Sequence, residues 1–165
     1  MMPDPRMAQV WDLLVREAAS LDERRWDDWL SLMAPDIEYW IPAWDGHEPI
    51  SDPANEMSLV YYESRQGLED RVYRLKSRRS AASEPLARTC HYVTNLRCEF
   101  LDDGSCLAWA NWQANNWRHG QTTTFWGRYE YLLKPTGQDG DWRIHKKKVL
   151  LMNDVVPTVL DVHLV

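Results

Sequence analysis

Histidines, carboxylates and cysteines are the residues of this 165-residue chain whose types allow metal or acid–base chemistry. The five histidines are dispersed, and the closest two, His145 and His163, are 18 positions apart. No carboxylate near them completes the two-histidine, one-carboxylate set that binds iron. Cys90 directly precedes His91, so a Cys-x-His cluster motif is absent, as are glycine-rich phosphate loops. These spacings predict no metal ligand and no bound cofactor on this chain.

General acid–base catalysis in a pocket is the chemistry that the remaining residues allow. The candidate bases are carboxylates near predicted helices, and their partners are strand residues: Asp27, Asp28, Asp36, Tyr39, Tyr61, Tyr62 and His91. Carboxylates near helix ends are favourable without any catalytic role, and a single histidine on a strand is more often structural. The sequence therefore favours a chain with no catalytic residue of its own.

A basic segment interrupts an otherwise acidic protein. Between residues 63 and 88, seven Lys or Arg stand against four acidic residues, whereas the whole chain has a net charge of −6. Such a segment is either a solvated face or a docking surface for a partner. Its basic residues are Arg65, Arg71, Arg74, Lys76, Arg78, Arg79 and Arg88.

Composition excludes several functional classes. A pI near 5.3 argues against binding to nucleic acid or to an anionic membrane. No apolar run approaches the roughly 20 residues of a membrane span, and the start lacks the pattern of a signal peptide. The three cysteines, Cys90, Cys98 and Cys106, are an odd number without metal-type spacing, which predicts reduced thiols in a cytoplasmic protein.

Three helices are expected in the first half of the chain. The first begins after Asp4, with Pro5 in its first turn, and presents one apolar face. Asp22 is expected to cap a second helix that extends to Met33, because Pro35 disfavours helix at the residue before it. The third follows Gly67, and it carries Leu68, Val72 and Leu75 at helical spacing.

Strands dominate the rest of the chain, over residues 37–41, 57–63, 92–101, 107–117, 123–134 and 142–152, with a loop over 42–55. In the strand over 92–101, Tyr92 is expected to share a face with Leu96, opposite His91. Turn signals at 103–104, 119–120 and 139–140 predict hairpins and an antiparallel meander. Residues 1–165 are therefore expected to form a single α+β domain, with the helices packed on one face of a curved antiparallel sheet.

Three stretches resemble the small (β) subunit of aromatic-ring-hydroxylating dioxygenases. They are LVREAASLDERRWDDWLSLMAPDIEYWIPAWD, SDPANEMSLVYYESRQGLEDRVYRLKS and SAASEPLARTCHYVTN. The long ordered pattern GLEDRVYRL, followed by an Arg-Thr-x-His run and Asn95, is specific, and the C-terminal VLDVHLV is similar to the family's ending. The resemblance runs from about Val15 to the C-terminus and is strongest to the benzoate, toluate and anthranilate branch.

The resemblance implies a cone-shaped fold like that of nuclear transport factor 2 (NTF2-like). It also implies a non-catalytic subunit of a terminal oxygenase, which forms a trimer within an α3β3 assembly and supports cis-dihydroxylation of an aromatic carboxylate, with benzoate first and anthranilate or a toluate next. The Rieske [2Fe–2S] cluster and the mononuclear Fe(II) are expected on the α subunit, with NADH feeding electrons through a reductase. The residues expected at subunit interfaces are Arg65, Arg71, Arg74, Arg88 and His91.

Two alternatives remain open at this point, because one fold hosts many functions. The first is a free-standing isomerase or dehydratase that uses Asp28 or Asp36 with His91 and a tyrosine. It predicts an open polar pocket with a carboxylate of raised pKa at its floor. The second is a stand-alone protein that binds a small molecule.

Overall fold

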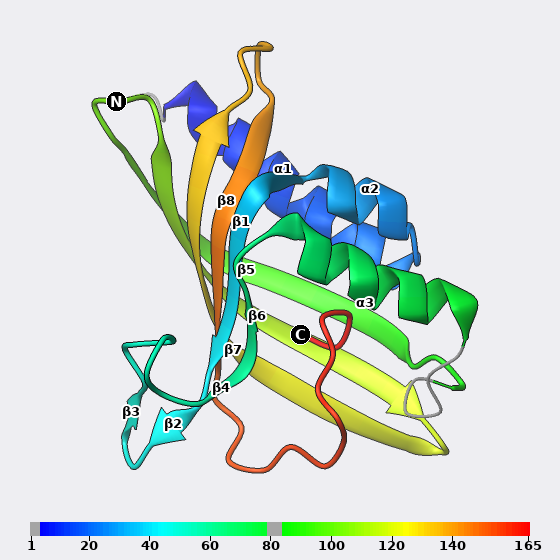
Figure 1. Cartoon of the computed structure of the whole chain (residues 1–165). Coiled ribbons are helices and arrows are strands. Elements are labelled where there is room, and N and C mark those ends of the chain that lie inside the picture. Colours follow the sequence, from blue (N-terminus) through cyan, green and yellow to red (C-terminus); the bar gives the residue numbers. More distant parts are fainter. Residues whose placement is uncertain (1–3, 79–83) are drawn as a thin grey trace.

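The computed structural model describes residues 4–78 and 84–165 of the protein. Helices lie on the concave side of a strongly curved six-stranded sheet, and the two layers enclose a cone (Figure 1). This arrangement confirms the α+β class predicted from the sequence. Arg79 of the basic segment lies outside the described residues.

The helices follow the predicted apolar faces, with one correction. The first, α1 (Pro5–Asp22), begins as expected, and the Asp4 side chain accepts a hydrogen bond from the Arg6 backbone N–H. The second, α2 (Trp26–Ser31), has Arg25 at its N-cap and no side-chain cap, whereas Asp22 is the last residue of α1 and its carboxylate binds the sheet. The prediction that Asp22 caps this helix is therefore wrong, and Met33 belongs to the following strand.

The third helix, α3 (Arg65–Ser77), buries Leu68, Val72 and Leu75 as predicted. Gly67 lies in its first turn and not at a break before it. A Cβ atom at Gly67 would lie 2.3 Å from Cδ1 of Tyr62, so a side chain here would push the helix off the strand that precedes it. The missing side chain lets α3 pack closely on that strand.

The sheet has the order β4-β1-β8-β7-β6-β5. Its strands are β1 (Met33–Pro42), β4 (Ser58–Tyr62), β5 (Arg88–Phe100), β6 (Cys106–Arg118), β7 (Gln121–Pro135) and β8 (Trp142–Leu151). The meander β5 to β8 is antiparallel as predicted, and His119 and Gly120 both have positive φ (51° and 77°), as a tight hairpin turn requires. The sheet is mixed, however, because β1 pairs with β8 in parallel.

Two local features depart from the predicted pattern. Asn95 has a φ of +57°, and the β5–β6 register shifts there, so a bulge reverses the faces of the strand. His91 and Val93 face inward before the bulge and Leu96 faces inward after it, whereas Tyr92 points outward with 51% of its surface exposed. The predicted loop over 42–55 contains a small hairpin of β2 (Trp44–Asp45) and β3 (Glu48–Pro49).

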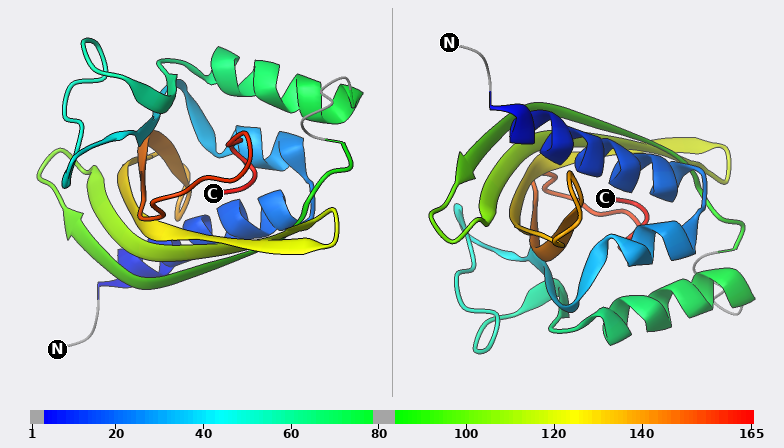
Figure 2. Two further views of the ribbon diagram at one scale, coloured as in Figure 1. Left: turned by 90° about the horizontal axis from the view of Figure 1, so that it is seen from below. Right: turned by 90° about the horizontal axis from the view of Figure 1, so that it is seen from above.

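The C-terminal segment lies between the helices and the sheet, inside the cone (Figure 2). Val162, Leu164 and Val165 are buried there and belong to the same apolar cluster as the core residues of α1 and the sheet. No described helix is long and apolar enough to cross a membrane. The interior of the cone is thus occupied by side chains from both ends of the chain.

Candidate functional site in the cone

A buried ion pair crosses the interior of the cone. Glu17 of α1 accepts a hydrogen bond from Lys147 of β8, with 2.6 Å between Oε1 and Nζ, and the two side chains are only 3% and 1% exposed. The Tyr131 hydroxyl donates to the other Glu17 oxygen at 2.8 Å. Lys147 Nζ also lies 4.2 Å from the centre of the Tyr129 ring. Each charge therefore has a partner in a region that excludes water.

Sequence reasoning missed this pair, although a signal was present. Glu17 stands on the apolar stripe of α1, four residues after Leu13, where a charged side chain must enter the core. Lys147 is the central residue of three consecutive lysines in β8, and alternation sends it inward while Lys146 and Lys148 stay on the outside. A carboxylate on one apolar face and a lysine on another predict a buried pair.

The tyrosines around this pair are poorly suited to act as general acids or general bases. Burial, followed by the nearby Glu17 carboxylate, raises the pKa of Tyr129 and Tyr131 well above the usual value. Burial and Glu17 have the same effect on the pKa of Tyr39, whose hydroxyl has no hydrogen-bond partner among the described residues. Because all three phenols stay neutral and are shielded from solvent, the interior fits a structural role better than acid–base catalysis.

At the wide end of the cone, Asp22 joins α1 to β5. Nδ1 of His91 lies 2.6 Å from Asp22 Oδ1, and the His91 backbone N–H donates to Oδ2 at 2.9 Å. The Thr89 hydroxyl donates to the same carboxylate at 2.8 Å. Burial alone would raise the pKa of the Asp22 carboxyl, but the hydrogen bonds from His91 and Thr89 outweigh it and lower that pKa. The Asp22 carboxyl group is thus held ionised, whereas a general acid must carry a proton.

The C-terminal segment is tied to α3 by a second ion pair. Arg71 Nε lies 3.3 Å from Asp161 Oδ1, and the two side chains are 22% and 13% exposed. The same Asp161 oxygen accepts a hydrogen bond from the Val162 backbone N–H at 2.7 Å. Asn116 of β6 donates to the Leu164 carbonyl oxygen at 3.2 Å. These bonds hold the buried tail inside the cone.

His163, in the buried tail, is kept neutral at physiological pH. Burial lowers the pKa of its imidazole to about 4, against a partial opposing effect of Asp161. Its ring packs edge-on against Trp26, with 6.0 Å between the ring centres. Other groups that disfavour its protonated form are His91, Arg24 and Arg118.

Replacing His163 should change the pH dependence of stability. The pKa of His163 is about 4 in the folded chain and 6.5 in the unfolded chain. Between pH 4 and pH 6.5, a proton therefore binds His163 of the unfolded chain in preference to the folded one. Stability should be complete above pH 6.5 and fall as the pH drops towards 4. His163→Gln should remove roughly 2–3 kcal/mol of the loss between pH 7 and pH 4.5, measured by denaturant unfolding. An unchanged loss would show that His163 is not the group responsible.

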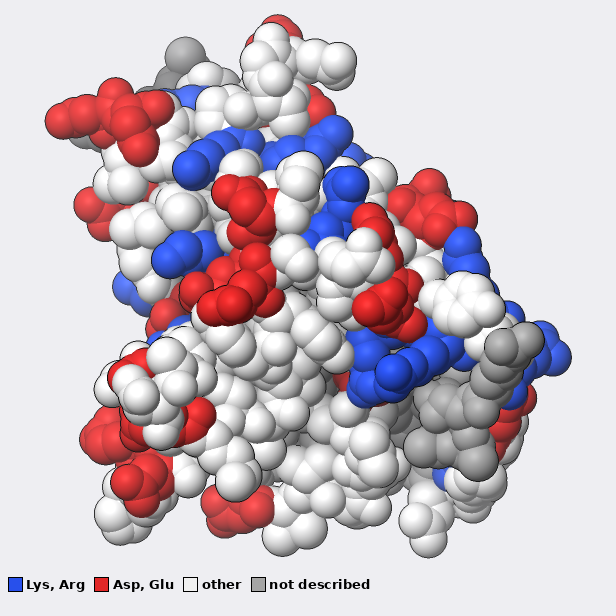
Figure 3. Space-filling model, viewed as in Figure 1, with Lys and Arg blue, Asp and Glu red and all other residues white. Residues whose placement is uncertain are grey.

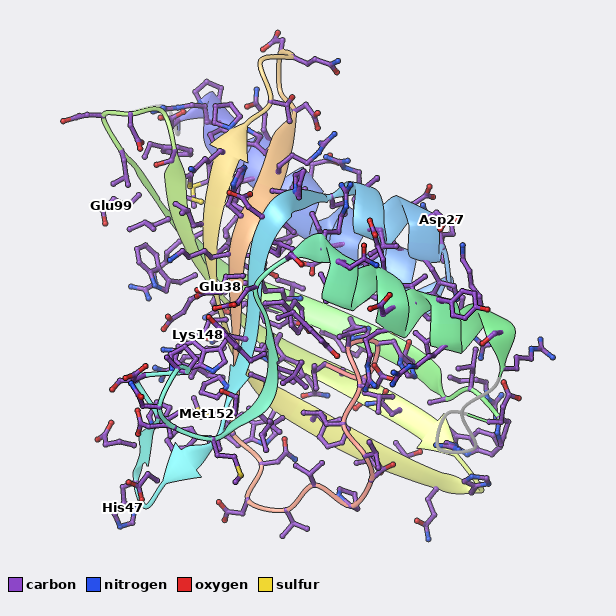
Figure 4. All side chains as sticks on the ribbon, in the orientation of Figure 1. Asp27, Glu38, His47, Glu99, Lys148 and Met152 are labelled. Carbon is purple, nitrogen blue, oxygen red and sulfur yellow. The ribbon has the colours of Figure 1, made fainter. Side chains whose placement is uncertain are left out.

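The structure does not assemble the carboxylates proposed for the alternative enzyme. Asp28 pairs with Arg25 at 2.5 Å, and Asp36 pairs with His145 at 3.2 Å on the outer side of the sheet. Asp27 lies on the outside of α2, with its side chain 77% exposed and bound to Lys76 (Figure 4). The candidate tyrosines are also apart from one another, because Tyr39 lies in the buried core and Tyr61 and Tyr62 lie on the edge strand β4. The carboxylate that faces His91 is instead Asp22.

Most of the predicted interface arginines have partners within the chain. Arg65 binds Glu69 at 3.0 Å, and the Arg88 guanidinium carbon lies 4.0 Å from the centre of the Trp117 ring on the outer face of the sheet. Arg74 is exposed, and within residues 4–78 and 84–165 its guanidinium makes no ion pair or hydrogen bond. His91 is only 2% exposed, so it supports the surface from beneath.

The described residues contain no group of three or more His, Cys, Asp or Glu that could hold a metal ion. Cys90, Cys98 and Cys106 are free thiols, as expected from the sequence. The side chains of the described cone therefore do not fit an iron–sulfur cluster or a mononuclear iron.

Comparison with known proteins places this geometry in context. Residues 16–158 match the family model described as ring hydroxylating beta subunit. The chain is 41% identical over 155 residues to the toluate 1,2-dioxygenase subunit beta of Pseudomonas putida, which covers 93% of this chain and 94% of that protein. It is 37% identical over 156 residues to the benzoate 1,2-dioxygenase subunit beta of Acinetobacter baylyi, covering 94% and 91% of the two chains.

Solved structures agree with the sequence comparison. The beta subunit of the benzoate 1,2-dioxygenase from Burkholderia mallei is 32% identical, with a TM-score of 0.80 and coverage of 100% of this chain and 99% of that chain. A hexachlorocyclohexane dehydrochlorinase is similar at a TM-score of 0.62 and 18% identity, covering 93% and 91% of the two chains. The second similarity concerns the fold alone, because one fold hosts many functions.

Proposed function

Because the chain belongs to the ring-hydroxylating β-subunit family, we propose that it is the single-domain, non-catalytic small subunit of a terminal oxygenase that dihydroxylates an aromatic carboxylate. The observation that carries this proposal is the make-up of the cone interior. Its centre contains the paired charges of Glu17 and Lys147, three neutral tyrosines and the buried tail, and among the described residues no carboxylate of raised pKa. Such an interior supports a scaffold better than an active site.

The redox chemistry of the oxygenase is assigned to other chains in this proposal. A Rieske [2Fe–2S] cluster and a mononuclear Fe(II) on the α subunit would activate O2, with electrons supplied from NADH through a reductase. The described residues of this chain offer no fitting ligand set for either group. The proposed substrate is benzoate, a toluate or anthranilate, and the first two are named in relatives of 37% and 41% identity, respectively. Assembly is proposed as α3β3 in the cytoplasm.

Exposed apolar side chains support a multisubunit assembly. Figure 3 shows a largely uncharged area over β4 and the C-terminal segment, with acidic side chains at its edges. Leu59, Val155 and Val159 are 45%, 73% and 67% exposed, respectively. On the outer face of the sheet, Tyr92 and Trp126 are 51% and 52% exposed. Interface cores are depleted in charge and enriched in aromatic residues, so both faces suit subunit contacts.

We propose that four of the five predicted interface residues act in two ways. Arg65 and Arg88 lie at the surface, where planar guanidinium groups can bind carboxylates of a partner. His91 and Arg71 brace the surface from within, because they fix Asp22 and the C-terminal segment. Arg74 lines a cavity beside α3.

Turnover by the assembled oxygenase tests this function. The chain should be co-expressed with the large chain encoded beside it, and O2 consumption should be measured with reductase, NADH and benzoate, anthranilate or a toluate. We expect aromatic carboxylate to be consumed only when the large chain is present, with none consumed by this chain alone. Consumption of substrate by the isolated, iron-free chain would contradict the proposed scaffold role.

A further inference from the structure

A cavity of about 240 Å³ opens at the wide end of the cone, among α3, the β6–β7 hairpin and the C-terminal segment. Since each water occupies roughly 30 Å³ of liquid, the cavity holds about eight waters. Its volume lies below the range of roughly 300–1,000 Å³ that is typical for drug-sized ligands. The cavity is therefore suited to a molecule with one ring and a short substituent.

The lining carries an excess of positive charge. Three arginines, Arg71, Arg74 and Arg118, stand against one carboxylate, that of Asp161. Asp161 is already engaged by Arg71, which leaves the Arg74 guanidinium without an intrachain carboxylate among the described residues. His163, which also lines the cavity, stays neutral. The electrostatic character of the site favours an anion.

The remaining wall is part apolar and part neutral polar, the polar part including Asn116, Gln121 and Thr123. Phe125 of β7 is 1% exposed, and its ring contributes to the lining together with Leu164 and Pro157. A small inorganic anion such as phosphate would leave this wall unused. A flat hydrocarbon ring would cover it while a charged group on the ring reached the arginines.

We propose that this cavity binds a small aromatic carboxylate, with the carboxylate on Arg74 and the ring against Phe125. Guanidinium groups bind carboxylates through two parallel hydrogen bonds, which makes Arg74 the residue that selects the charge. The ligand class follows from the lining of the cavity. That this ligand class is also the substrate class of the oxygenase rests on the proposed function. If both hold, the cavity is a second site for substrate or product, on the non-catalytic subunit.

Isothermal titration of the isolated full-length chain tests this proposal. Benzoate should bind saturably with one site per chain, whereas acetate, which lacks the ring, and benzyl alcohol, which lacks the charge, should bind at least tenfold more weakly. Arg74→Gln should weaken benzoate binding by tenfold or more, because a charge-assisted hydrogen bond is lost. Arg97→Gln, the same change on the outer face of the sheet, should leave it unchanged.

Three results would overturn the proposal. One is benzoate that does not bind the chain. Another is benzoate that binds equally well to the Arg74→Gln variant. The third is that benzoate does not bind and the Arg74→Gln variant assembles poorly with the large subunit. That result would mean that the cavity binds an acidic side chain of a partner. None of these results affects the turnover test of the subunit function, which uses the assembled oxygenase.

Discussion

Replacement of Lys147 with methionine is expected to lower the free energy of unfolding of the chain by about 3–5 kcal/mol. The change would leave the Glu17 carboxyl group buried without its cation, while the Tyr131 hydroxyl remained its only hydrogen-bond donor among the described side chains. Denaturant unfolding at pH 7 and a fixed protein concentration measures the effect, and fixed concentration matters because assembly also stabilises a chain.

The double variant Glu17→Gln, Lys147→Met is the matched control. It removes both charges and keeps side chains of similar volume, so its cost should be far smaller than that of Lys147→Met alone. If the single and double variants were equally destabilised, the cost would come from lost packing and the charge pair would not organise the interior.

A variant that stops after Asp161 is expected to lose roughly 5 kcal/mol or more, because burying each of the apolar side chains Val162, Leu164 and Val165 is worth about 1.5–3 kcal/mol. All three are at most 7% exposed in the intact chain. The deletion also breaks the hydrogen bond from Asn116 to the Leu164 carbonyl. Thermal unfolding of the truncated chain measures the loss, and failure to fold in isolation would agree with it.

Val155→Ala provides the comparison for this truncation. Val155 lies in the same segment but is 73% exposed, so its replacement should change stability by no more than about 0.5 kcal/mol. A truncated chain that unfolds at the temperature of the intact one would contradict the account, because the tail would then not fill the cone.

The parts of the fold that repeat locally were predictable from the sequence. Leu68, Val72 and Leu75 recur at helical spacing and are buried together, and the hairpin turn at His119 and Gly120 follows from turn chemistry. The face reversal at Asn95 was not predictable, because a bulge inserts one residue without altering the alternating pattern on either side. The parallel β1–β8 pair depends on contacts between distant segments, on which local periodicity has no bearing.

The candidate site shows the same division. His91 was singled out from the sequence, but its partner Asp22 was expected to cap α2, because a short polar residue at a helix boundary satisfies either role. Lys147 was not recognised as buried, since a run of three lysines suggests solvent exposure. Pairing with Glu17, 130 positions away, makes its burial favourable.

The central claim is that this chain is a metal-free scaffold within an oxygenase. Native mass spectrometry with iron analysis tests it most directly. The tagged chain should be isolated from cells that also express the large chain of the oxygenase. We expect a complex with equal numbers of the two chains, a mass that fits α3β3, and iron that remains with the large chain after the subunits are separated. A chain recovered alone and without iron from cells shown to contain the large chain would contradict the account.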